Sequence, residues 1–434
     1  MTMTTIEALD PITNPPSTDN AKHLAHRYQE VRQTSLRLAE PLTPEDMVAQ
    51  SMADASPVKW HLAHTTWFFE AMVLREARPD YDWYCADFHY LFNSYYNTLG
   101  KQFTRSQRGL VSRPGVAETL AYREHVDQVM SSFLLGAEEA ELARWAPIVE
   151  VGLHHEQQHQ ELLLTDVKHL FFHNPLFPVY RQWPADATSV TSPPLGWQHF
   201  PKEIYSIGHQ GEGFAYDNEG PRHETLLHAF EIADRLVTCG EYLEYMEAGG
   251  YERPDHWLSE GWATVQELGW DSPLYWFRRD DEWWHYTLAG ARPVEAEEPV
   301  MHLSLFEADA YARWAGARLP TEMEWEAAAA GEPIIGNFVE NEVFHARAAT
   351  AEEGKGMFGN VWEWTSSSYA PYPGYRPPEG ALGEYNGKFM CNQYVLRGGS
   401  FATSRSHIRA TYRNFFPASA RWQFTGLRLA KDST

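Results

Sequence analysis

Residues 148–169 read Ile-Val-Glu-Val-Gly-Leu-His-His-Glu-Gln-Gln-His-Gln-Glu-Leu-Leu-Leu-Thr-Asp-Val-Lys-His, and this stretch decides how the first half of the chain is interpreted. It lacks proline and is rich in helix formers after Gly152, which predicts a long helix. His155 and His159 then stand one turn apart on the same face, where two imidazoles can bind one metal ion. The alternative is a solvated polar face. Because His155, Glu156 and His159 also satisfy the string His-Glu-x-x-His, a zinc hydrolase is a further alternative.

An earlier stretch, Ser56-Pro-Val-Lys-Trp-His-Leu-Ala-His64, offers a third ligand for the same ion. Its Ser-Pro opening predicts the start of a helix. His61 and His64 lie three residues apart on that helix, and only one of them needs to face a shared site. Three neutral imidazoles leave open coordination positions on the metal, which suits redox-active iron as well as zinc hydrolysis.

Length and charge limit the classes of function. A chain of 434 residues is longer than one hydrophobic core usually supports, so two domains are expected. The formal net charge of −24 argues against binding to nucleic acid or to an anionic membrane surface. Three scattered cysteines suit a reducing compartment without a disulfide framework. Since no secretory signal or membrane-spanning run is visible, we expect a cytoplasmic protein.

Helix-forming patterns cover four ranges of the first half: 21–42, 56–75, 116–135 and 138–172. They predict a four-helix bundle over residues 21–174, preceded by a flexible tail over residues 1–20. A polar segment bounded by prolines, residues 175–195, is the expected linker. Residues 196–434 combine short strand-like runs with many glycines and tryptophans, and the fold class is therefore α+β. Clear helices there are expected only after the N-cap residues Ser304 and Thr321.

Five short strings follow one another in the second half of the chain. They are Pro299-Val-Met-His-Leu-Ser, Arg318-Leu-Pro-Thr-Glu-Met-Glu-Trp-Glu, Gly359-Asn-Val-Trp-Glu-Trp-Thr365, Arg397-Gly-Gly-Ser-Phe401 and Gly426-Leu-Arg-Leu-Ala430. Together with the histidine strings, they make nearly the whole chain resemble the ergothioneine-biosynthesis sulfoxide synthases, or hercynine oxygenases. The resemblance implies a DinB-like four-helix bundle fused to a C-type-lectin-like domain of the formylglycine-generating-enzyme type.

The same resemblance implies the chemistry. It places Fe(II) on His64, His155 and His159, and it predicts a dioxygen-dependent C–S bond between hercynine (Nα-trimethylhistidine) and cysteine, giving a sulfoxide. True formylglycine-generating enzymes carry a cysteine pair after the Arg-Gly-Gly-Ser string. Residues 402–408 contain no cysteine, so thiol-based copper chemistry is not expected here.

Several further site residues are expected. Tyr95 and Tyr96, in an aromatic segment between the second and third helices, are candidates for the proton donor. In better-known relatives the acid comes from the C-terminal domain, and that option stays open through four tyrosines: Tyr369, Tyr372, Tyr375 and Tyr385. Arg105 and Arg108 match paired arginines that bind the carboxylate of the cysteine substrate, although a solvated surface pair is the alternative.

On the hercynine side, the resemblance implies contacts from Gln158 and Asn414. Some relatives that use γ-glutamylcysteine have a Trp-Asp pair where this chain has Phe415 and Phe416. We therefore expect free cysteine as the second substrate, and a ring face of Phe416 for the trimethylammonium group.

Four alternatives remain open on the sequence. The same reaction could use γ-glutamylcysteine, or a selenium donor as in a selenium-incorporating relative. A zinc-dependent DinB-type hydrolase or thiol transferase would use the three histidines with Glu156 as base. A lectin-like binding protein without catalysis would retain no metal.

Overall fold

The computed structural model describes residues 18–183, 191–211 and 213–433, and it contains two compact units. The first comprises the chain up to Asn174 together with Pro377–Tyr385, and the second comprises Pro175–Arg376 and Asn386–Thr434. The short segment Pro377–Tyr385 thus belongs with helices that precede it by more than 200 residues. Most of the expected tail, and residues 184–190 of the expected linker, lie outside the described residues. The domain boundaries at residues 20, 174 and 195 stay predictions.

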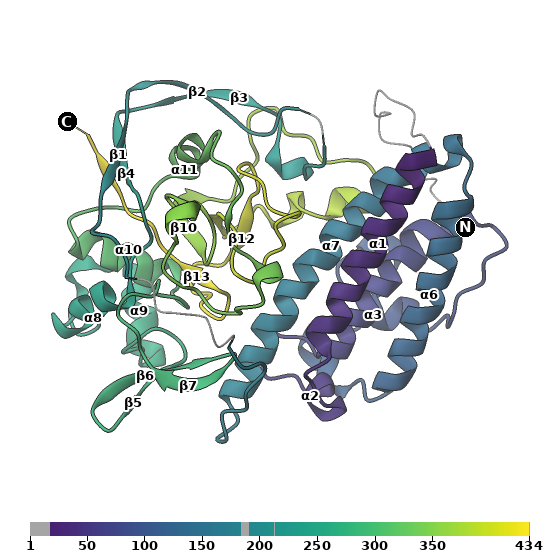
Figure 1. Ribbon diagram of the computed structural model, residues 1–434, viewed down its shortest axis with the longest axis horizontal. Coiled ribbons are helices and arrows are strands. Elements are labelled where there is room, and N and C mark those ends of the chain that lie inside the picture. The colour runs from purple at the N-terminus through teal and green to yellow at the C-terminus, as the bar shows by residue number, and fades with distance from the viewer. Residues whose placement is uncertain (1–17, 184–190, 212, 434) are drawn as a thin grey trace. The chain divides into compact units, whose positions relative to one another are not determined.

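Four long helices form the first unit: α1 (Thr18–Ala39), α3 (Val58–Phe69), α6 (Val116–Gly136) and α7 (Glu139–Phe172). Helices α1 and α3 each pack against both α6 and α7, and Figure 1 shows the four running side by side. The predicted four-helix bundle is confirmed. Every residue of α3 is buried, whereas α7 has exposed residues near its start and continuous buried runs at residues 152–157 and 163–169.

Shorter elements connect these helices. Helix α2 (Pro44–Val48) begins at a Thr43 capping box, and α3 continues through a π-helical turn (Glu70–Leu74) into α4 (Arg75–Ala77). The aromatic segment contains α5 (Phe88–Phe92) and two 3₁₀ turns, Asn97–Leu99 and Arg105–Leu110. Ser56 does not cap α3 with its side chain, since the structure shows no side-chain cap there.

The second unit combines small sheets with four helices. Its central sheet has the order β12 (Asn414–Phe416), β11 (Tyr394–Arg397), β10 (Trp362–Ser368) and β13 (Thr425–Gly426). A second sheet has the order β1 (Trp197–Phe200), β4 (Phe230–Ala233) and β14 (Ala430–Asp432). A third joins β5 (Trp276–Arg279), β6 (Glu282–Thr287) and β7 (Gly290–Pro293).

Two strand pairs complete the sheets of the second unit: β2 (Glu203–Ile207) with β3 (His223–Leu227), and β8 (Gly336–Asn337) with β9 (Phe358–Gly359). Its helices are α8 (Cys239–Glu247), α9 (Ser259–Leu268), α10 (Leu305–Trp314) and α11 (Glu322–Ala329). Capping boxes at Ser304 and Thr321 start α10 and α11 and confirm both predicted N-caps. With a helical bundle and a mixed second unit, the α+β prediction is confirmed.

Residues of the five strings of the second half bond to one another in the interior of the second unit. Arg428 donates two hydrogen bonds to Glu363, which also accepts from the indole of Trp325. Arg397 donates to Glu322 and Glu326 at 2.9 and 3.0 Å. Each guanidinium is fully buried and has a carboxylate partner, which is how a protein interior tolerates such charge. These strings therefore form the scaffold of the second unit.

Among the described residues, no helix is both long and apolar enough to cross a membrane. The cytoplasmic location stays a prediction.

Candidate metal centre

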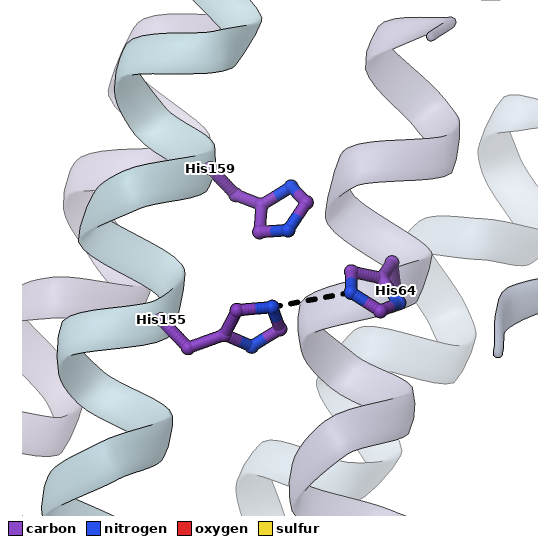
Figure 2. A group of neighbouring side chains, drawn as sticks. All are labelled: His64, His155 and His159. Atoms are coloured by element: carbon purple, nitrogen blue, oxygen red, sulfur yellow. Dashed lines mark hydrogen bonds between the residues drawn. The ribbon is translucent and has the colours of Figure 1, made fainter. Parts of the chain in front are cut away.

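Three buried or half-buried histidines of the first unit converge on one point. His155 and His159 project from α7, and His64 faces them from α3 (Figure 2). One nitrogen of each ring can be chosen so that all three lie within 4.8 Å of one another. Nε2 of His64 lies 3.2 Å from Nε2 of His155. Two nitrogens about 2.1 Å from one ion and at right angles would be about 3 Å apart, so this separation fits a shared metal.

Hydrogen bonds and burial prepare these imidazoles to act as ligands. Nδ1 of His64 lies 2.6 Å from the carbonyl oxygen of Phe92, which can only accept, so Nδ1 carries the proton and Nε2 keeps its lone pair. Among the described residues, Nδ1 of His155 has no hydrogen-bond partner. Burial lowers the pKa of His155 to about 3, and burial followed by repulsion from His155 lowers the pKa values of His64 and His159. All three rings are therefore neutral near pH 7, as metal binding requires.

A cluster of three tyrosines lies beside the histidines. The hydroxyl of Tyr385 donates to Oε1 of Gln158, and its ring centroid is 5.8 Å from that of His155. The ring of Tyr95 stacks on that of Tyr96, with 4.7 Å between their centroids, and meets the ring of Tyr385 edge-on, with 6.1 Å between their centroids. Burial raises the pKa of Tyr95, and hydrogen bonds with Tyr96 and Tyr385 offset part of that rise. The structure thus brings together Tyr95, Tyr96 and Gln158 from the predicted set, and it adds Tyr385.

The two predicted arginines have different surroundings. Arg108 is 3% exposed, and its guanidinium lies 3.3 Å from the ring centroid of Trp60, which stacks on His64 at 4.6 Å. Its Nη atoms donate to serine hydroxyls, and its Nε has no partner among the described residues. Desolvation, followed by repulsion from Arg105, lowers the pKa of Arg108 to about 9. Arg105 is exposed and donates to the carbonyl of Asp54. Of these two arginines, Arg108 is the buried one and lies beside the histidines.

Comparisons with known proteins agree with this architecture. Residues 27–163 match the family model of the DinB superfamily, and residues 204–354 and 354–433 match the Sulfatase-modifying factor enzyme 1-like domain. The chain is 30% identical to Hercynine oxygenase of Mycolicibacterium smegmatis over 438 residues, covering 94% of this chain and 98% of that protein. It is also 30% identical to Hercynine oxygenase of Mycobacterium tuberculosis, covering 95% of this chain and 99% of that protein. The chain belongs to the hercynine oxygenase family.

A more distant relative extends the comparison. Ergothioneine biosynthesis protein 1 of Schizosaccharomyces pombe is 29% identical over 232 residues, which cover 50% of this chain and 28% of that protein. Membership of the hercynine oxygenase family makes this chain an oxygenase enzyme, and the reading as a lectin-like protein without catalysis is therefore wrong.

The position of Glu156 argues against a zinc hydrolase on this hercynine oxygenase scaffold. Its carboxylate is fully buried and accepts from Arg32 of α1 at 2.8 Å, from Ser35 at 2.6 Å and from Arg123 of α6 at 2.5 Å. These charged partners lower the pKa of Glu156 to about 2 against the opposing effect of burial. A general base needs an oxygen lone pair that can reach a water molecule at the metal. Glu156 instead joins the helices of the bundle.

The remaining predicted residues lie in the second unit. Asn414, Phe415 and Phe416 form β12, and the Oδ1 of Asn414 accepts the backbone N–H of Phe415. The Phe415 ring stacks on the Tyr369 ring, with 4.1 Å between their centroids. The Phe416 ring meets the Trp422 ring edge-on, with 6.4 Å between their centroids. All three side chains are half-buried. Their contacts with a substrate stay predictions.

Sequence reasoning did not assign roles to three residues of this centre. Tyr385 was one of several tyrosines and has no local signal, since its partner Gln158 is 227 residues away. His61, which is not one of the ligands implied by the resemblance, contacts His159, and their Nδ1 atoms are 2.8 Å apart. Asp166 contacts His61. It lies seven residues after His159, about two turns further along the same face of the helix, and this spacing could have indicated a partner for the histidines.

Proposed function

We propose that this chain is a non-haem Fe(II) and dioxygen-dependent sulfoxide synthase that joins hercynine to free cysteine in ergothioneine biosynthesis. The reaction converts hercynine, cysteine and dioxygen into hercynylcysteine sulfoxide and water. A C–H bond of the imidazole and the S–H bond of cysteine are lost, and a C–S bond forms. One oxygen atom enters the sulfoxide and the other leaves as water, so the two substrates supply the electrons that reduce dioxygen.

The three-histidine cluster is the observation that carries this proposal. His64, His155 and His159 offer three neutral nitrogens and no carboxylate, a donor set that leaves open positions on an iron ion. Fe(II) held there supplies coordination positions for thiolate, imidazole and dioxygen, together with the electron transfer that dioxygen chemistry needs. The family supports this choice, because its named members are oxygenases.

Arg108 is the proposed anchor for the carboxylate of cysteine. No ion pair of the described residues includes this buried cation, and an unpaired buried charge is costly. A carboxylate ligand would compensate it through charge-assisted hydrogen bonds. Arg105 is exposed, and we propose that it contributes long-range charge and no direct contact. Phe415 and Phe416, in place of a Trp-Asp pair, support free cysteine over γ-glutamylcysteine as the second substrate.

Tyr95 is the proposed proton donor, with Tyr385 orienting it. The hydroxyl proton of Tyr385 is already donated to Gln158, whereas Tyr95 adjoins both other hydroxyls of the cluster. A raised pKa keeps Tyr95 protonated at neutral pH, so that it holds the proton the reaction requires. Tyr96 is fully buried against Trp67 and Phe68, which suits a packing role. Gln158 and Asn414 are the proposed contacts of hercynine.

The test is anaerobic reconstitution with Fe(II), followed by air and hercynine with either cysteine or γ-glutamylcysteine. Products are identified by mass spectrometry, and oxygen uptake is recorded. Protein loaded with Zn(II) is the matched control, since zinc has no redox chemistry and cannot transfer electrons from the substrates to dioxygen. We expect hercynylcysteine sulfoxide from free cysteine with iron only.

Each other outcome contradicts a specific part of the proposal. Product from γ-glutamylcysteine alone would keep the reaction and overturn the substrate. Hydrolysis or thiol transfer by the zinc-loaded protein would support a DinB-type hydrolase instead. Incorporation of selenium from a selenium donor, with no sulfoxide from either thiol, would support a selenium-incorporating relative.

A further inference from the structure

A chain of hydrogen bonds leads from the histidine cluster into the bundle. Nδ1 of His159 lies 2.8 Å from Nδ1 of His61, and Nε2 of His61 lies 3.0 Å from Oδ2 of Asp166. His61 is 3% exposed and Asp166 is 6% exposed. His61 comes from α3 and the other two from α7, so the chain crosses between the helices that supply the three histidines.

The chemistry of the last residue sets the proton positions along this chain. An ionised carboxylate only accepts hydrogen bonds, so Nε2 of His61 donates to Asp166. A neutral His61 then has a lone pair on Nδ1 and accepts there, which requires Nδ1 of His159 to donate. His159 is thereby held in the tautomer whose Nε2 carries the free lone pair. The Phe92 carbonyl imposes the same tautomer on His64.

Asp166 has a second contact, which leads to the buried arginine. Its Oδ2 also accepts the backbone N–H of Ser56 at 2.7 Å. The hydroxyl of Ser56 in turn accepts from Nη1 of Arg108 at 2.9 Å. Oδ2 of Asp166 is therefore in contact with His61, which bonds to His159, and with Ser56, which bonds to Arg108.

We infer that His61 and Asp166 are positioning residues that fix the tautomer and ring orientation of His159 for metal binding, while Asp166 also holds the start of α3 against Arg108. Partners of this kind orient ligand imidazoles and raise their basicity, and their loss typically costs about 10–100-fold in metal affinity. The inference rests on the proposed metal site. Neither residue contacts the metal or a substrate in this assignment.

The test measures Co(II) affinity by competition with a chelating dye, together with the visible spectrum of the Co(II) protein and urea unfolding of the metal-free protein. His61→Leu and Asp166→Ala remove the contacts, while His61→Gln and Asp166→Asn keep groups that can accept or donate. His169→Leu is the matched control for a buried histidine of α7, and Nδ1 of His169 bonds to the hydroxyl of Ser51. Asp127→Ala is the matched control for a carboxylate that pairs with Arg32 in the same bundle.

We expect His61→Leu and Asp166→Ala to weaken Co(II) binding at least about tenfold and to alter the spectrum. The two conservative variants should recover part of the affinity, and the controls should bind Co(II) like wild type even where they lower stability. Unchanged Co(II) affinity in His61→Leu would overturn the inference, as would an equal loss in the controls. Wild-type protein that binds no Co(II) would contradict the metal site itself, and with it the proposed function.

Discussion

The hydroxyl of Tyr385 lies 2.5 Å from Oε1 of Gln158, so the segment Pro377–Tyr385 contacts the helix that carries His155 and His159. This contact places an oriented phenol beside the histidine cluster. It also brings Tyr385 to Tyr95, whose ring centroid is 6.1 Å away. The second half of the chain thus completes the tyrosine cluster of the first unit.

Single substitutions can distinguish the roles of Tyr95 and Tyr385. We expect Tyr95→Phe to lower kcat for sulfoxide formation by about 10²–10⁴-fold, because a positioned acid contributes that much. Tyr385→Phe should lower kcat by about fivefold, since it removes an orienting hydrogen bond of about 1 kcal/mol. Iron content should not change in either variant. Tyr375→Phe, whose hydroxyl bonds to Asp217 in the second unit, is the control. A larger loss from Tyr385→Phe would make Tyr385 the donor.

Arg108 should determine the affinity for cysteine. Arg108→Gln removes a charge-assisted contact worth about 1.5–3 kcal/mol, so KM for cysteine should rise by about 10–150-fold while KM for hercynine changes little. Arg105→Gln is the matched control, because Arg105 is exposed, and we expect less than a threefold change. Steady-state kinetics with each substrate varied in turn gives both values. Equal effects of the two substitutions would contradict the assignment.

Glu156 should act on stability. Glu156→Gln leaves the buried Arg123 without its carboxylate partner and Arg32 with Asp127 alone, which costs about 3–5 kcal/mol in the free energy of unfolding. Urea unfolding of the metal-free protein measures this loss. If the variant instead keeps wild-type stability and loses all activity, Glu156 is a catalytic base, and this result would support the zinc-hydrolase interpretation.

The pH dependence of stability should contain a contribution from Glu150. Hydrogen bonds from His154 and Arg27 outweigh the effect of burial and lower the pKa of Glu150 from 4.5 to about 2. Between these two values the unfolded chain binds a proton that the folded protein does not, so stability falls as pH decreases from 4.5 towards 2. Glu150→Gln should flatten this part of the stability curve, while the exposed Glu124→Gln should not. An unchanged slope in Glu150→Gln would contradict the assignment.

Metal loading should stabilise the first unit. Free Fe(II) at about 100 times its Kd adds about 2.7 kcal/mol to the folded state, which raises Tm. Anaerobic melting with and without Fe(II) measures the shift, and a chelator should reverse it. His64→Asn should abolish the shift, whereas His173→Asn, which changes a histidine that contacts His169 and Phe172, should keep it. A shift that persists in His64→Asn would place the ion elsewhere.

Features that depend on local spacing follow from the amino-acid sequence alone. Residues 155 and 159 share a helix face because the α-helical repeat places them there, and the capping boxes at Ser304 and Thr321 need only neighbouring residues. The four helices and the order of the second-half strings were sufficient for the α+β architecture and the family. The shared helix face and the caps depend on neighbouring residues alone, so the sequence is sufficient to predict them.

Features that depend on packing between distant segments are visible only in the folded protein. The folded protein distinguishes His64 from His61, although both lie on one helix. His64 belongs to the histidine cluster and lies next to His155, whereas His61 contacts Nδ1 of His159. The fold also separates the buried Arg108 from the exposed Arg105, turns Glu156 towards Arg32 and Arg123, and brings Tyr385 to Gln158. In each case the role of a side chain depends on which residues of another segment pack against it. Residue type and spacing do not contain that information.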